Sequence, residues 1–144
     1  MFCVEFDGGT LLQSQKGSVT GSVFLSCDEI DFPCTGWSDF PIVIANWWLT
    51  ELRRVERREP AELRFMDGPY VARIRAVSDD LIGVECIEER NVERLVCSSV
   101  VSTEGLSSSV KRFAHALEMA CRAAGIESGD VTRLRSLLGL DSDA

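Results

Sequence analysis

Four alternating segments between residues 63 and 101, separated by turn signals, constrain the fold of this chain more than any other feature. In the third segment, for example, Ile82, Val84 and Cys86 are apolar and the residues between them differ, which is the period of a half-buried strand. Turn-forming residues separate the segments at 67–69, 78–80 and 88–91. Strands joined by tight turns pair antiparallel. The sequence therefore predicts a four-stranded meander, although the pattern does not assign the facing of its last strand, 92–101.

Two further strands are predicted before the meander. Residues 2–6 alternate in the same way, and we expect Gly8-Gly9 to break that strand. Residues 18–28 alternate again and end in the acidic segment 28–31. These patterns bring the predicted total to about six strands.

Three helices are predicted. The first is expected to be capped by Ser38 or Asp39 and to run to about Arg58, before Pro60. The second begins at Ser102 or Thr103, ends before Gly125 and carries the clearest apolar stripe in the chain. The third spans 130–138. The apolar stripe of the second helix consists of Leu106, Val110, Phe113, Leu117, Ala120, Cys121 and Ala124.

The predicted element order is ββαββββαα. An antiparallel sheet with one apolar face needs a cover, which the helices provide. We therefore expect one α+β domain over residues 1–140, with helices packed on one face of the sheet. Residues 141–144 are expected to form a polar C-terminal tail.

The charge balance narrows the class of partner. The 144 residues include 15 basic and 23 acidic ones, a net charge of −8. An acidic chain repels phosphate backbones, so we predict no nucleic-acid partner. The same charge steers a basic protein inward, although acidity also simply keeps a protein soluble.

The sequence suggests a cytoplasmic protein. It contains no apolar run long enough to cross a membrane, and its first residues lack the features of a signal peptide. The six cysteines form no C-x-x-C pair, and Cys27, Cys86 and Cys121 lie among apolar residues. We interpret them as reduced, buried side chains rather than zinc ligands.

No catalytic or cofactor motif is present. His115 is the only histidine and lies off the apolar stripe of its helix, and no G-x-S-x-G or phosphate-binding glycine loop occurs. Asp28, Glu29 and Asp31 lack the pattern of a calcium loop. We predict that the protein is not an enzyme and binds no cofactor or metal.

Tryptophan residues are the more informative candidates for a binding site. Trp47 and Trp48 are adjacent on the first helix and therefore point about 100° apart. Trp48 lies on the apolar stripe with Ile44 and Leu52, so Trp47 is expected at its border or outside. Trp37 lies in the preceding loop. Surface tryptophans often anchor protein interfaces. The alternative is that Trp37 and Trp47 pack under a neighbouring strand or loop.

Three sequence runs resemble small bacterial proteins encoded in polymorphic-toxin loci, where a toxin domain is paired with a cognate immunity protein. The runs are Gly-Trp-Ser-Asp-Phe-Pro at 36–41, Trp-Trp-Leu at 47–49 and Arg-Phe-Met-Asp-Gly-Pro-Tyr at 64–70. The resemblance implies a cytosolic protein that binds one toxin and blocks its active site. Because such families share no common binding motif, the resemblance does not assign a functional role to any particular residue of this sequence.

The candidate partner-binding residues are therefore chosen by the chemistry of their side chains. Acidic groups would face basic toxin groups, and aromatic side chains would supply apolar anchors. One alternative is a different kind of binding module, such as an adaptor, a secretion chaperone or a homodimer. Another is a small enzyme that uses His115 or a carboxylate pair. The candidate residues are Asp28, Glu29, Asp31, Trp37, Asp39, Phe40 and Trp47.

Overall fold

A computed structural model describes residues 1–140; the tail predicted for 141–144 lies outside the described residues. Within them the chain forms an α+β fold, as predicted, with antiparallel strands and three helices. The six predicted strands are present and two short ones are added. The eight strands form two four-stranded sheets, where a single sheet was expected.

The first sheet contains β1 (Phe2–Gln13), β2 (Val19–Cys27), β3 (Ile30–Phe32) and β4 (Ser38–Asp39). β2 is central and pairs with the other three strands. The prediction that Gly8-Gly9 breaks β1 is wrong, because the strand continues to Gln13 through a shift in register between Asp7 and Leu12. The Asp7 carboxylate accepts a hydrogen bond from the Gly9 N–H at 2.9 Å. This local contact supports the irregular backbone, so the strand bends instead of ending.

The second sheet is the predicted meander, formed by β5 (Ala61–Arg64), β6 (Tyr70–Ala76), β7 (Leu81–Glu89) and β8 (Glu93–Ser102) in that order. A register shift interrupts the β7–β8 pairing between Cys86 and Ile87. Since such a shift changes which side chains share a face, it explains why simple alternation does not assign the facing of β8.

The helices are α1 (Pro41–Glu56), α2 (Thr103–Ala124) and α3 (Gly129–Leu137). The N-cap of α2 is Ser102, whose hydroxyl accepts a hydrogen bond from Gly105, and Gly125 ends the helix in the left-handed conformation, both as predicted. The predicted cap of α1 is wrong. Its N-cap residue is Phe40, and no side chain caps the helix, since Ser38 and Asp39 form β4.

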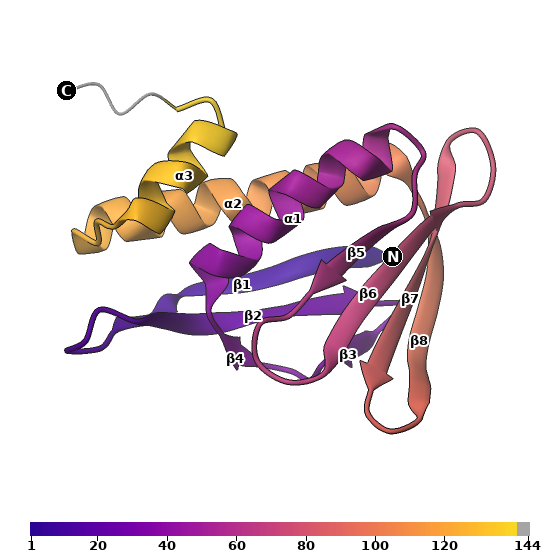
Figure 1. The fold of residues 1–144 in the computed structure, drawn as a ribbon, viewed down its shortest axis with the longest axis horizontal. Helices are drawn as coiled ribbons and strands as arrows, with labels where there is room; N and C mark the ends of the chain where they lie inside the picture. Colours follow the sequence, from indigo (N-terminus) through magenta and orange to yellow (C-terminus); the bar gives the residue numbers. More distant parts are fainter. Residues whose placement is uncertain (141–144) are drawn as a thin grey trace.

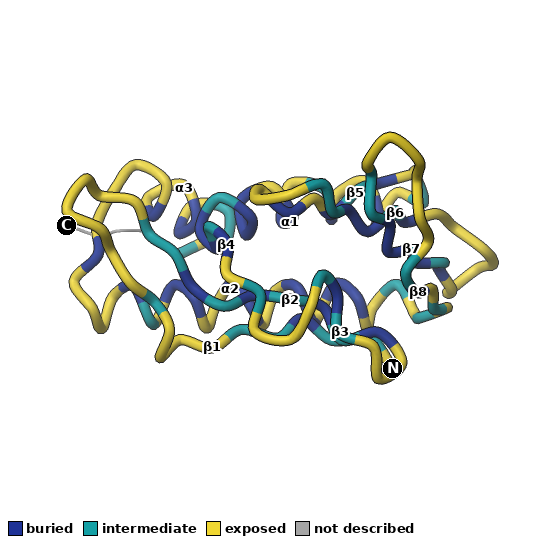
Figure 2. Tube along the Cα trace, turned by 90° about the horizontal axis from the view of Figure 1, so that it is seen from below, coloured by how far each residue is buried: buried dark blue, intermediate teal, exposed yellow. Residues whose placement is uncertain are grey.

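Figure 1 shows the three helices gathered on one side of the strands, with α2 lying along β1 and α1 beside α2. In the perpendicular view of Figure 2, buried segments from α1 and the second sheet face buried segments from α2 and the first sheet. One hydrophobic core joins both sheets and all three helices. An unbroken series of edge-on or tilted aromatic contacts runs through it: Phe6, Phe113, Trp48, Phe65, Phe32, Tyr70 and Trp37.

Candidate functional site

The two adjacent tryptophans of α1 lie in opposite environments, as the helical periodicity predicts. Trp48 is fully buried, and its indole N–H donates a hydrogen bond to the Arg64 carbonyl oxygen at 2.8 Å. Its ring centroid lies 5.4 Å from that of Phe65. Trp47, in contrast, is 44% exposed. Part of the Trp47 indole surface is therefore free to contact a partner.

Trp47 lines an open cleft of about 450 Å³ between α1, β5 and α3. Two acidic and two basic side chains surround the indole, so an apolar centre has a charged rim. The residues lining the cleft are Asn46, Trp47, Thr50, Glu51, Glu62, Arg64 and Arg133.

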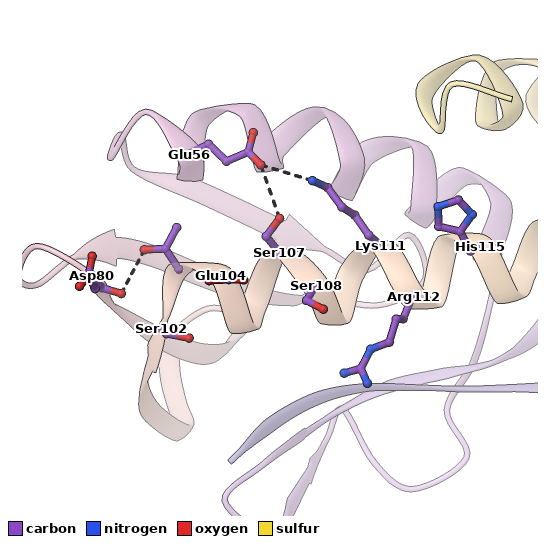
Figure 3. Close-up of a pocket in the computed structure, with 10 residues that line it drawn as sticks. Glu56, Asp80, Ser102, Glu104, Ser107, Ser108, Lys111, Arg112 and His115 are labelled. Carbon is purple, nitrogen blue, oxygen red and sulfur yellow. Dashed lines mark hydrogen bonds and ion pairs between the residues drawn. The ribbon is translucent and has the colours of Figure 1, made fainter.

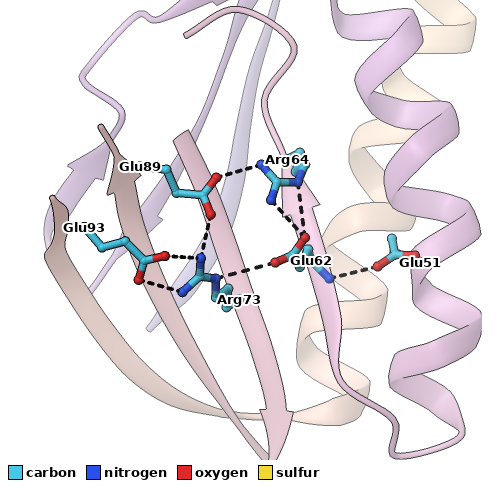
Figure 4. A network of polar contacts seen from close by, with 6 residues as sticks. All are labelled: Glu51, Glu62, Arg64, Arg73, Glu89 and Glu93. Atoms are coloured by element: carbon cyan, nitrogen blue, oxygen red, sulfur yellow. Dashed lines mark hydrogen bonds and ion pairs between the residues drawn. The ribbon is translucent and has the colours of Figure 1, made fainter. Parts of the chain in front are cut away.

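A network of ion pairs holds one side of this rim in place (Figure 4). Arg64 contacts Glu62 at 3.1 Å and Glu89 at 2.9 Å. Arg73 contacts Glu62 at 3.5 Å, Glu89 at 2.5 Å and Glu93 at 2.6 Å. The network thus links all four strands of the second sheet, from β5 to the start of β8. Four of these side chains have at least two charged partners each, which restricts the rotamers available to them: Glu62, Arg64, Arg73 and Glu89.

The electrostatics of the network agree with its geometry. The Arg64 guanidinium, with Arg73 beside it, holds the pKa of Glu89 below its ordinary value, against the opposing effect of burial. Glu62 is also fixed through its backbone, since its N–H donates to the Glu51 carboxylate at 2.8 Å. On the rim, Arg64 and Glu62 are therefore each held by several contacts.

Asn46 adds an uncommon polar atom to the cleft wall. The residue is 6% exposed, and its amide nitrogen donates to the Asp130 carbonyl oxygen at 3.1 Å. Its side-chain oxygen has no hydrogen-bond partner among the described residues. A buried acceptor without a donor costs about 1–3 kcal/mol, and because this oxygen is buried beneath the cleft surface it is closed to a partner.

Asp39, which the sequence suggested as a partner-binding acid, is buried (2% exposed). Its carboxylate accepts hydrogen bonds from the Trp37 indole at 2.8 Å, from the Phe40 N–H at 2.7 Å and from the Asp67 N–H at 3.1 Å. Burial raises the pKa of Asp39, although these three donors favour its charged form. The carboxylate joins β4 to the β5–β6 loop and offers no free oxygen at the surface, so we leave it out of the candidate site.

Trp37 and Phe40 are both half-buried. The Trp37 ring packs edge-on against Tyr70, with ring centroids 5.2 Å apart, while its indole N–H is taken by Asp39. Trp37 packs against the core beside the β5–β6 loop, where Gly68 lies near its ring. The structure does not bring Trp37 or Phe40 to the Trp47 cleft.

The acidic residues of segment 28–31 lie at the β2–β3 hairpin. Asp28 and Glu29 are exposed, and both adopt left-handed backbone conformations at its tip. Asp28 forms an ion pair with the N-terminal amine of Met1, which lowers the pKa of its carboxyl group. Asp31 is half-buried and accepts a hydrogen bond from Thr35 at 2.6 Å. The seven candidates thus fall into three separate groups, and only Trp47 lines the cleft.

A larger open cleft, of about 870 Å³, follows the exposed face of α2 and includes His115. Figure 3 shows Glu56 reaching Lys111 and Ser107, each at 3.5 Å, whereas His115 lies further along the helix, apart from these contacts. Within residues 1–140, no hydrogen bond joins His115 to a serine or cysteine side chain.

Comparisons with known proteins add no relative: no family model matches the sequence, and neither a curated protein nor a solved structure matches the chain. In the described part of the chain, none of the helices combines the length and the apolar character needed to span a membrane.

Sequence reasoning found Trp47 but missed the residues around it in the cleft. Glu62, Arg64 and Arg133 are distant from Trp47 in sequence, so no local pattern indicated them.

Proposed function

We propose that this protein is a cytoplasmic immunity protein that binds a bacterial toxin domain and neutralises it, with the Trp47 cleft at the centre of the interface. The observation that carries the proposal is the 44% exposure of Trp47 within a charged rim. Tryptophan is the residue type most enriched among those that dominate binding energies.

The ordered rim supports this role. Binding loses free energy when side chains must be immobilised, at about 0.5–1.5 kcal/mol for each flexible side chain. Arg64 and Glu62 are already held by neighbouring charges in the free protein. They therefore present donors and acceptors to a partner at a lower entropic cost than isolated surface charges.

The overall charge supports a basic partner. At a net charge of −8, the field of the protein attracts a basic surface and accelerates encounter. Toxin domains that act on phosphate-containing substrates carry such surfaces, because they must hold an anion. The exposed Asp28 and Glu29 contribute to this long-range attraction even though they lie on a different part of the surface.

Neutralisation in this proposal is steric. The corner formed by α1, β5 and α3 would seat the Trp47 indole in an apolar depression of the toxin, while the two acids of the rim, Glu51 and Glu62, would pair with basic groups around its substrate entrance. A standard interface buries about 1,600 Å² in total, which is available on a protein with 7868 Å² of accessible surface. No group of the immunity protein needs to react.

Co-expression tests the proposal. The product of the gene next to this one is expressed in bacteria, alone and together with this protein, and survivors are counted. We expect killing by the neighbour alone and rescue by this chain. A harmless neighbour, or killing that this chain does not prevent, would contradict the proposal.

Self-association or an adaptor role is the second candidate, because an exposed tryptophan can also bury itself against a copy of the same chain. Analytical ultracentrifugation of the isolated protein separates the two. A monomer at micromolar concentration supports a heterologous partner. A dimer that Trp47→Ala dissociates supports the second candidate.

A further inference from the structure

Three of the six cysteines converge in the interior, where the two sheets meet. Cys27 is the last residue of β2, whereas Cys86 and Cys97 are register partners on β7 and β8. Their sulfur atoms all lie within 4.8 Å of one another. Cys27 and Cys86 are fully buried, and Cys97 is 8% exposed.

Ordinary packing accounts for a single buried cysteine better than for this arrangement. Cys121 shows the ordinary case, since it is buried on α2 and is not part of the group. In the triad of Cys27, Cys86 and Cys97, by contrast, three thiols from two different sheets point at one position. Thiols pack no better against one another than against aliphatic groups, so hydrophobic burial gives no reason for the convergence.

The spacing suits a thiolate-bound metal ion. Sulfur ligands lie about 2.3 Å from zinc, so three of them around one ion are about 3.8–4.0 Å apart. The sulfur atoms of the triad need to move together by less than about 1 Å from their upper limit of 4.8 Å to reach that spacing. Side-chain rotation alone can supply such a movement.

Metal binding by the triad would release protons. Thiolates rather than thiols coordinate metal ions, so a bound cation would displace the thiol protons of its ligands.

We propose that Cys27, Cys86 and Cys97 bind one thiophilic d¹⁰ metal ion, Cu⁺ or Zn²⁺, which joins the two sheets. Soft thiolate ligands select these ions over Mg²⁺ or Ca²⁺. Among residues 1–140, no histidine or carboxylate belongs to the group. Three sulfur ligands complete a trigonal Cu⁺ site, whereas Zn²⁺ would take a fourth ligand from solvent on the side of Cys97.

Metal titration of the reduced protein tests the site. Cd²⁺, as the spectroscopic substitute for Zn²⁺, and Cu⁺ are added separately under anaerobic conditions, and the ultraviolet thiolate-to-metal charge-transfer band is followed. We expect saturation at one ion per chain for at least one of them. With that ion at a hundredfold its Kd, the melting temperature should rise by about 5–10 °C. Competition with a chelator of known affinity shows which ion binds more tightly.

Cysteine variants locate the ion. Cys97→Ala removes the least buried ligand, and Cys121→Ala, a buried cysteine outside the triad, is the matched control. Stoichiometric binding should be lost in the first and kept in the second. Binding that survives Cys97→Ala, or no binding of either ion to the unaltered protein, would overturn the proposal.

A measurement on the unaltered protein covers the case in which a variant does not fold. X-ray absorption of the metal-loaded protein reports the ligand atoms directly. We expect three sulfur atoms in the first shell, alone for Cu⁺ and with one solvent oxygen for Zn²⁺. A shell dominated by nitrogen or oxygen would place the ion elsewhere and overturn the proposal.

Discussion

Trp47 and Trp48 are neighbours in the chain, yet the first is 44% exposed and the second is fully buried. Their effects on stability should differ accordingly. Trp48→Ala leaves a cavity between Phe65 and Phe113 and should lower the free energy of unfolding by about 3–5 kcal/mol. Trp47→Ala should lower it by about 1 kcal/mol or less. Denaturant unfolding of both variants checks this, and equal losses would show that Trp47 is a core residue.

Asp39 should behave as a structural residue. Asp39→Ala removes the acceptor for the Trp37 indole and for the N–H groups of Phe40 and Asp67. Donors left without partners should lower the free energy of unfolding by about 2–4 kcal/mol. Asp31→Ala, which removes a half-buried acid from the neighbouring hairpin, is the control and should change stability much less. An Asp39→Ala protein of unaltered stability that fails to bind the partner would instead restore Asp39 to the interface.

A buried ion pair attaches α3 to α2. The Glu118 carboxylate contacts Arg135 at 2.9 Å, and the two side chains are only 4% and 10% exposed. Arg135→Ala leaves a buried carboxylate with the exposed Arg122 as its remaining partner and should destabilise the fold by about 3 kcal/mol. Arg122→Ala removes the exposed partner and should cost less than about 1 kcal/mol. Similar losses in both variants would contradict this account.

The same ion pair predicts a pH dependence. Burial alone would raise the pKa of Glu118, but Arg135 and Arg122 outweigh it and hold the pKa below its ordinary value of 4.5. A carboxyl group with a depressed folded-state pKa contributes stability that is present above the unfolded value and lost as pH falls through the folded value. The difference in unfolding free energy between the native protein and Glu118→Gln should therefore shrink below about pH 4.5. A difference that is constant from pH 7 to pH 3 would contradict it.

The elements that the sequence predicts well are those specified by neighbouring residues. The stripe of α2, its cap at Ser102 and its end at Gly125 all follow from local spacing, as does the opposite facing of Trp47 and Trp48. Gly8-Gly9 misled the prediction because the backbone irregularity is supported by Asp7 and Thr10, which a rule based on glycine alone ignores. Every strand pairs within its own side of α1, and alternation does not encode whether the sheets on the two sides join.

The candidate site was predictable only in part for the same reason. Trp47 could be identified because helical geometry placed it off the core stripe. The burial of Asp39 depends on Asp67, 28 residues later in the chain, and this contact has no local signature. The cysteine triad unites residues from β2, β7 and β8, so the spacing rules for zinc motifs do not apply to it.

In the proposed function, Trp47 anchors the partner protein. The most direct measurement is the affinity of the neighbouring gene product for the unaltered protein, for Trp47→Ala and for Met119→Ala, by calorimetry. Met119 is 68% exposed on α2 and lies outside the cleft. We predict that Trp47→Ala weakens binding about 30-fold or more, as expected for a residue contributing at least about 2 kcal/mol, and that Met119→Ala changes it less than about twofold. Equal affinities for all three proteins, or no binding at all, would contradict the account.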